Sequence, residues 1–254
     1  MGTFRAIVFA SVIAGFTVGL IVTGLQQFGT VPLILKAEVF EKAVEAHQGA
    51  HAAPGPQETV ASHSHSDHVH AAEAWEPRDG LERNAYTAAA NVLTAIGFAL
   101  LLAGFFSVRS GATGESVSWH EGLMSGLAGF LVFTIAPGIG LPPELPGVPT
   151  APLLSRQIWW GVAALATAAG LGLVVFRRSV PASIAGLMLI VLPHLIGAPE
   201  LEHVDTNVPS SLSHQFVVAV TLTSLAFWSM LGGLTSIAFA YFDRESVKRH
   251  PLRA

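Results

Sequence analysis

The 254-residue sequence contains no cysteine and few charged residues, and both absences limit what the protein can be. Without cysteine there is no disulfide, no thiolate nucleophile, no iron–sulfur cluster and no thiolate metal site. Any metal binding then falls to histidine, carboxylate, methionine sulfur or backbone carbonyl groups. The formal net charge of −4 provides no basic surface of the kind that nucleic-acid binding needs, so nucleic acid is excluded as a partner.

Nucleotide-binding and enzyme signatures are also missing. No Walker motif and no Gly-rich dinucleotide motif followed by an acidic residue occurs, which excludes transport driven by ATP hydrolysis within this chain. Membrane di-iron enzymes carry several histidine boxes at helix ends, whereas the clustered histidines here fall in one loop. The sequence therefore predicts a protein that is not an enzyme.

Apolar residues dominate what is present. Hydrophobic residues make up 51% of the chain, charged residues 12%, and the mean hydropathy is +0.55, all typical of a membrane protein. We predict an all-α integral membrane protein, a single membrane domain built as a bundle of six transmembrane helices. Their expected ranges are 4–28, 84–108, 121–141, 155–176, 184–198 and 212–242, most of them close to the ~20 residues that cross a bilayer.

Some of these segments carry alternatives. The segment 184–198 is short and contains Pro193, and a five-span arrangement would make it re-entrant. A cleaved signal peptide is the alternative for 4–28, where Gly15 and Gly19 form a small-xxx-small pair suited to close helix packing. A short amphipathic helix is expected after Pro32, and Pro137 is expected to break the third span.

Lysine and arginine in short loops predict the orientation, because these residues accumulate on the cytoplasmic side. With six spans, one face collects the basic residues Arg5, Arg109, Arg177, Arg178, Arg244, Lys248, Arg249 and Arg253. Both termini are therefore expected in the cytoplasm of a bacterium, with the protein in its inner membrane. The 46–83 loop, Glu144 and the 200–205 loop are expected to face the periplasm together.

The 46–83 loop is rich in histidine and lacks helical or strand periodicity, so we expect it to be flexible. Six of the 11 histidines lie there: His47, His51, His63, His65, His68 and His70. A His-rich tract without fixed geometry is suited to transient capture of a divalent transition metal. A spacer that happens to contain histidine is the simpler interpretation.

A second group of candidate ligands lies at the outer ends of the later spans. It consists of Glu144, His194, His203 and His214, of which His194 follows Pro193 at membrane depth. Ionisable residues inside the membrane are costly and indicate function, and Pro-interrupted helices commonly build transporter sites. The alternatives are a packing histidine, solvated loop acids, or haem held by His194 and His214.

Three features are assigned ordinary structural roles. Trp159 and Trp160 are expected in an aromatic belt, and Arg156 is expected to anchor the fourth span at the interface. Glu121 and His120 are interpreted as a capped helix start rather than an exit site. Asn91 is expected to join helices by hydrogen bonds.

Several sequence blocks resemble the CbtA family, a predicted cobalt transporter subunit of bacteria. The blocks are Ala136-Pro-Gly-Ile-Gly-Leu-Pro-Pro-Glu-Leu-Pro-Gly147, Arg156-Gln-Ile-Trp-Trp160, Leu192-Pro-His-Leu-Ile-Gly-Ala-Pro199 and Phe227-Trp228. The resemblance implies cobalt uptake linked to cobalamin synthesis and a small single-span, histidine-bearing partner, CbtB. The family is usually described with five spans.

The sequence as a whole predicts an uptake transporter for a divalent metal, with Co²⁺ as the cargo. Ligand type alone does not separate Co²⁺ from Ni²⁺ or Zn²⁺. A non-transporting metal-binding or assembly subunit and a haem-binding membrane redox protein remain as alternatives. The lipid bilayer is an expected partner, and an oligomer is compatible with the sequence.

Overall fold

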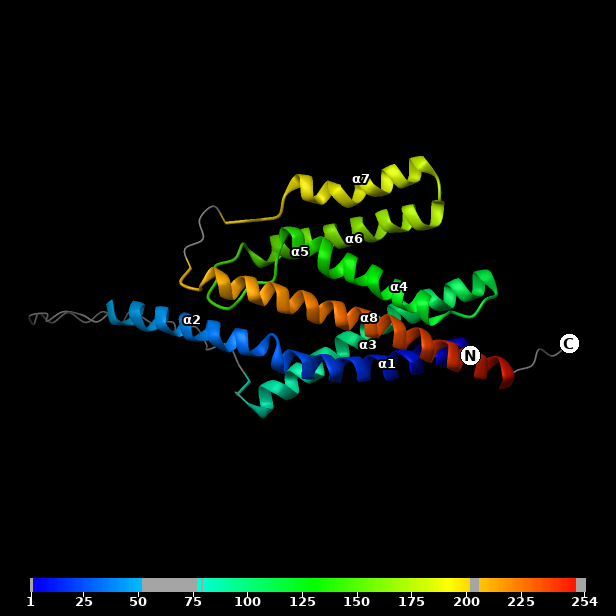
Figure 1. Ribbon diagram of the computed structural model, residues 1–254, viewed down its shortest axis with the longest axis horizontal. Helices are drawn as coiled ribbons and strands as arrows, with labels where there is room; N and C mark the ends of the chain where they lie inside the picture. The colour runs from blue at the N-terminus through cyan, green and yellow to red at the C-terminus, as the bar shows by residue number, and fades with distance from the viewer. Residues whose placement is uncertain (1, 52–76, 79, 202–205, 250–254) are drawn as a thin grey trace, which may run out of the picture.

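The computed structural model describes residues 2–51, 77–78, 80–201 and 206–249, and every regular element in these ranges is helical (Figure 1). This confirms the all-α prediction. The elements are α1 (Gly2–Phe28), α2 (Val31–His51), α3 (Leu81–Thr113), α4 (Trp119–Phe130), the π-helical turn η1 (Leu131–Ile135), α5 (Ala136–Gly140), α6 (Leu153–Arg177), α7 (Val180–Ile196) and α8 (Ser210–Arg249).

Among the described residues, five helical segments are long and apolar enough to cross a membrane. They are α1, α3, α4 together with η1 and α5, α6, and α8. The remaining expected span forms α7, a helix of 17 residues that is shorter than the other five. It begins at Val180, earlier than expected. Backbone N–H groups in the first turn of a helix have no partner within the helix, so Pro181, which lacks an N–H, is tolerated there.

The helices also extend into both ends of the expected 46–83 loop. α2 continues to His51, and α3 begins at Leu81. The amphipathic pattern after Pro32 is confirmed for the first turns of α2, where Leu33 and Ala37 are buried.

Small residues bring α1 close to α3 and α8. A side chain at Gly15 would collide with the backbone of Ile96, and one at Gly19 would collide with the backbone of Val92. This confirms the packing role predicted for the two glycines, since only hydrogen at these positions lets the backbones approach. The opposite face of α1 exposes large apolar side chains that suit a lipid surface, among them Phe9, Ile13, Phe16 and Leu20.

A second glycine seam joins α4 to α8. Gly122, Gly126 and Gly129 of α4 lie against Ser236, Gly232 and Trp228 of α8. The three α4 glycines are spaced by four and three residues, so they share one helical face. The seam places the first half of the third span firmly on α8.

Buried side chains define two ends of the bundle. At one end, called the terminal end, Ala6, Phe106, Val117 and Phe239 pack together, and the start of α1 and the end of α8 lie on this side in Figure 1. Residues 141–152 form the connector between α5 and α6, and the end of the bundle where it lies is called the connector end. A second cluster there joins α2, the connector and the start of α8. Its members are Leu33, Ala37, Leu145, Val208, Leu212 and Phe216.

α6 and α7 form an antiparallel hairpin on one side of this bundle (Figure 1). Gly170 and Gly186 let the two backbones touch midway along it. The hairpin meets the other described helices chiefly through η1 and α5, rather than by packing along α8. A space is therefore left between α6 and α8 at the connector end.

Candidate metal pathway at the connector end

The third span changes from α-helix to π-helix just before Pro137. The amide of Ala136 donates to the carbonyl of Leu131, five residues earlier, instead of four. Proline lacks an N–H, and its ring crowds the carbonyl one turn before it, so a widened turn relieves the clash. The helix then continues to Gly140. The expected interruption is confirmed only as a change of helix type before Pro137, because the π-turn accommodates the proline and the helix ends at Gly140.

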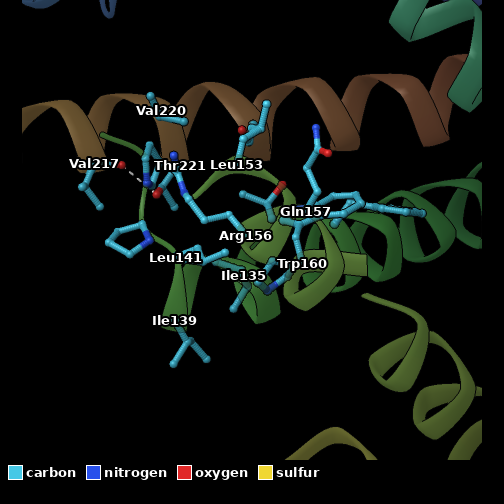
Figure 2. A pocket seen from close by; sticks show the side chains of 17 residues that line it. Ile135, Ile139, Leu141, Leu153, Arg156, Gln157, Trp160, Val217, Val220 and Thr221 are labelled. Carbon is cyan, nitrogen blue, oxygen red and sulfur yellow. Dashed lines mark hydrogen bonds between the residues drawn. The ribbon is translucent and has the colours of Figure 1, made fainter. Parts of the chain in front are cut away.

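An open cavity of about 790 Å³ lies beside this turn (Figure 2). Its walls come from η1 and α5, from 141–143 of the connector, from the start of α6 and from α8. The labelled side chains in Figure 2 include Arg156, Gln157 and Trp160 on α6, facing the same space as Val217, Val220 and Thr221 on α8. The Thr221 hydroxyl donates to the Val217 carbonyl at 2.7 Å within its own helix.

Arg156 is the one charged side chain among the described residues that line this cavity. Its Nη2 donates to Oε2 of Glu144 at 2.6 Å, and the two side chains are 26% and 28% exposed. Such partly buried, charge-assisted pairs are stronger than neutral hydrogen bonds. The cavity rim at this point therefore carries a neutralised ion pair.

His194 lies near the end of α7, against the first turns of α6. Its imidazole and the Trp159 indole are edge to face, with ring centroids 5.7 Å apart. Nδ1 of His194 and Nε1 of Trp159 are both buried, and neither has a hydrogen-bond partner among the described residues. Unpaired buried nitrogens are costly, so this pair of rings forms an unsatisfied polar position in the membrane domain.

The expectation that Pro193 interrupts its helix is wrong. α7 runs through Pro193 and ends at Ile196, where Gly197 adopts a φ of +89°. The helix continues for three residues beyond Pro193, although this proline has no N–H to donate to the carbonyl of Leu189, and it ends where Gly197 leaves the helical region.

The comparison with protein families matches residues 4–240 to a family described as "Probable cobalt transporter subunit (CbtA)". The chain belongs to the CbtA family. No curated protein and no solved structure matches it. Membership makes this membrane protein a probable cobalt transporter subunit.

Three of the candidate ligands lie at the connector end of this CbtA-family protein. Glu144 is in the connector, His194 is at the end of α7, and His214 is in the exposed first turns of α8. The described residues contain no group of three or more His, Asp or Glu side chains placed to hold one metal ion. His63, His65, His68, His70 and His203 lie outside the described residues, so the full ligand set stays a prediction.

The terminal end has polar contacts that stabilise the start of α4. Ser118 and Glu121 form a reciprocal capping box, and Arg109 of α3 pairs with Glu121. The Trp119 and His120 rings are in contact, with centroids 3.7 Å apart. The predicted capped helix start is confirmed.

Sequence reasoning missed the roles of Trp159 and Arg156. Trp159 is 8% exposed and packs on Gly140 and His194, whereas its neighbour Trp160 is 39% exposed and lines the cavity. An arginine in the first turn of an apolar helix, 12 residues after an acid in a Pro-rich segment, was the available signal for the ion pair.

Proposed function

We propose that this CbtA-family chain is the subunit through which Co²⁺ enters the cell, and that the imported metal supplies cobalamin synthesis. The family match supports cobalt as the transported substrate. Histidine and carboxylate ligands without any thiolate suit a borderline divalent ion that must be released again.

In the proposed topology, α7 also crosses the membrane, which makes six crossings. α6 ends at the terminal end, where Phe176 lies beside Phe105, and α8 starts at the connector end, where Leu212 is buried. The chain must return between these points. The 17 residues of α7 span about 25 Å at 1.5 Å per residue, close to the ~30 Å hydrocarbon core.

The proposed orientation places the terminal end in the cytoplasm and the connector end in the periplasm. The arginines next to short loops support this, because they gather at the terminal end, whereas most basic residues of the connector end flank the long segment 52–76, which counts little in the positive-inside rule. The arginines of the terminal end are Arg5, Arg109, Arg177, Arg178 and Arg244.

The proposed route starts with capture by His63, His65, His68 and His70 of the outer loop. The metal then passes to a site near the membrane that uses His194 together with Glu144, His203 and His214. The observation that carries this step is the buried Nδ1 of His194, which has no partner among the described residues. A neutral imidazole with an unused ring nitrogen is a ready metal ligand. The cavity beside η1 supports onward passage next to an irregular helix.

We also propose that a small single-span, histidine-bearing subunit of the CbtB type completes the transporter within the lipid bilayer. Exposed apolar side chains on the outer faces of α6 and α7 support such a contact, among them Leu165, Leu187 and Met188. A higher oligomer is compatible with the same faces.

Radioactive cobalt uptake by cells carrying His194→Ala tests the assignment. At limiting cobalt we expect uptake to fall well below wild type, because the inner site loses its membrane-embedded ligand. His120→Ala is the control, since His120 lies at the terminal end against Trp119. Both variants must be present in the membrane in equal amounts. Wild-type uptake by His194→Ala would remove His194 from the route.

A non-transporting metal-delivery subunit is the second candidate, favoured by the lack of a three-ligand group among the described residues. The purified chain can be reconstituted in vesicles that enclose a dye whose fluorescence Co²⁺ quenches. This experiment separates the transporter from the metal-delivery subunit. Quenching without any partner protein supports a transporter, whereas cobalt binding without quenching supports the delivery role. The visible absorption spectrum of the same preparation tests the haem interpretation.

A further inference from the structure

The α6–α7 hairpin and the rest of the bundle form two bodies that border the cavity from opposite sides. α8 supplies one wall, and α6 supplies the facing wall. Because the hairpin meets the other described helices chiefly through η1 and α5, a small rotation about that short region would change the distance between α6 and α8.

The connector ties these two bodies together through adjacent side chains. Leu145 is 3% exposed and packs in the cluster with Val208 and Phe216, which belongs to the main bundle. Glu144, the residue before it, is paired with Arg156 on α6. Leu145 thus holds the connector to the bundle, and its neighbour Glu144 holds it to the hairpin.

The connector backbone is poorly suited to hold this position by itself. Pro142, Pro143 and Pro146 have no N–H to donate, so a regular backbone ladder cannot form there. Gly147 follows with a φ of +79°, and its carbonyl accepts from the Thr206 hydroxyl at 3.3 Å. The Glu144–Arg156 side-chain pair is therefore the charged link from connector to hairpin.

We propose that the Glu144–Arg156 ion pair is a latch that holds α6 and α8 at their present separation, and that the cavity between them widens when a divalent cation replaces the guanidinium at the Glu144 carboxylate. A cation in the cavity would find no available carboxylate while the latch is formed, since no described carboxylate lines the wall and Glu144 at the rim is paired with Arg156. Exchange at Glu144 gives the cation a carboxylate ligand and frees the hairpin to move. Both side chains remain about a quarter exposed, so a cation that enters from water can reach the carboxylate.

The exchange step rests on the proposed transport of Co²⁺, but the latch does not. The absence of cysteine makes the latch directly measurable, because Ser224→Cys places a single thiol on the α8 wall of the cavity. The rate at which membrane-impermeant thiol reagents label this cysteine reports how accessible the α8 wall of the cavity is. A cationic and an anionic methanethiosulfonate reagent are used in parallel, because each variant also changes the local charge.

In the Ser224→Cys background, we expect Glu144→Gln and Arg156→Gln each to be labelled about tenfold faster by both reagents, the change that 1.4 kcal/mol in an opening equilibrium produces. The matched control is Glu38→Gln. It breaks the Arg83–Glu38 pair between α3 and α2, which has the same 2.6 Å separation and 33% and 22% exposure. This control is expected to label at the parent rate.

Co²⁺ should accelerate labelling of the Ser224→Cys parent and have no effect in the two latch variants. The exchanged pair Glu144→Arg with Arg156→Glu should restore slow labelling, which separates latch loss from misfolding. Parent rates in both single variants would overturn the latch, as would opposite effects of the two reagents, which indicate charge alone. If both single variants are labelled faster but Co²⁺ does not change the labelling rate of the parent, the latch is supported and the exchange of Arg156 for Co²⁺ is rejected. Cobalt uptake by wild type tests the transport function separately.

Discussion

The glycine seam between α4 and α8 gives a prediction with opposite signs at neighbouring positions. A Cβ at Gly232 would lie 2.8 Å from both Cα and N of Gly126, and the backbone carbonyl of Gly122 is also in its way. These are backbone atoms and cannot rotate aside. A Cβ at Gly233, the next residue, meets nothing within 4 Å.

The magnitude follows from packing distances. Carbon atoms in contact prefer about 3.5–4.0 Å, so Gly232→Ala must separate the two helices by roughly 1 Å and forfeit a quarter to a half of the local dispersion energy. Overpacking of this kind costs about 1–3 kcal/mol. Gly233→Ala instead gains about 0.5–1 kcal/mol from reduced backbone freedom. The two variants should therefore differ by about 1.5–4 kcal/mol in the free energy of unfolding.

Unfolding in mixed detergent micelles, followed by circular dichroism and tryptophan emission, measures this difference. Trp228 packs on Gly129 in the same seam, so its emission should shift to longer wavelength in Gly232→Ala as the helices separate. Equal stability of the two alanine variants would refute the close approach of α4 and α8.

Three further predictions concern other parts of the molecule. Asn91→Leu removes donations from Nδ2 to Thr23 Oγ1 at 3.0 Å and to Gln26 Oε1 at 2.7 Å, and should lower the unfolding free energy by about 0.6–1.7 kcal/mol in the same assay; an unchanged value would argue against this link between α1 and α3. Glu121→Ala removes the capping box and the partner of Arg109, and should cost about 1–2 kcal/mol, whereas His120→Ala should have little effect on stability. Deletion of residues 52–76 should reduce cobalt uptake at scarce metal and leave uptake at excess metal unchanged, because a collecting loop raises capture rather than the rate through the membrane; equal loss at both concentrations would contradict the collecting role.

The helical architecture was largely predictable because the need to satisfy backbone groups in lipid leaves few alternatives to an apolar helix. The expected spans and the observed helices overlap throughout, and the capped helix start expected at His120 and Glu121 is the start of α4. The helix ends were less predictable. α2 reaches His51 and α3 begins at Leu81, since polar residues outside the membrane continue a helix without any change in hydropathy.

The effects of the prolines could not be predicted from their positions. Pro137 and Pro193 were both expected to interrupt helices, yet the first follows a π-turn in a helix that continues to Gly140, and the second lies inside α7. Whether a helix breaks depends on room for the displaced carbonyl, which only the surrounding packing provides.

The candidate site divides in the same way. His194 was predicted from its type and depth, but its contact with Trp159 depends on how α6 lies against α7. Glu144 and Arg156 were both expected at the outer interface with separate roles. Their ion pair forms because the connector folds back onto α6 and brings together two side chains that are 12 residues apart. No local sequence pattern specifies this path.

By itself, the sequence determined that this protein is an all-helical membrane protein, that no cysteine is present to bind a metal, and which loops carry positive charge. These follow from composition and order along the chain, because burial in lipid and ligand chemistry act on residue types. Only the tertiary structure decided that Gly232 touches another helix while Gly233 touches nothing, and that Glu144 is bound to Arg156. Contacts between distant segments depend on how helices rotate and cross, and that is set by the packing of the whole bundle.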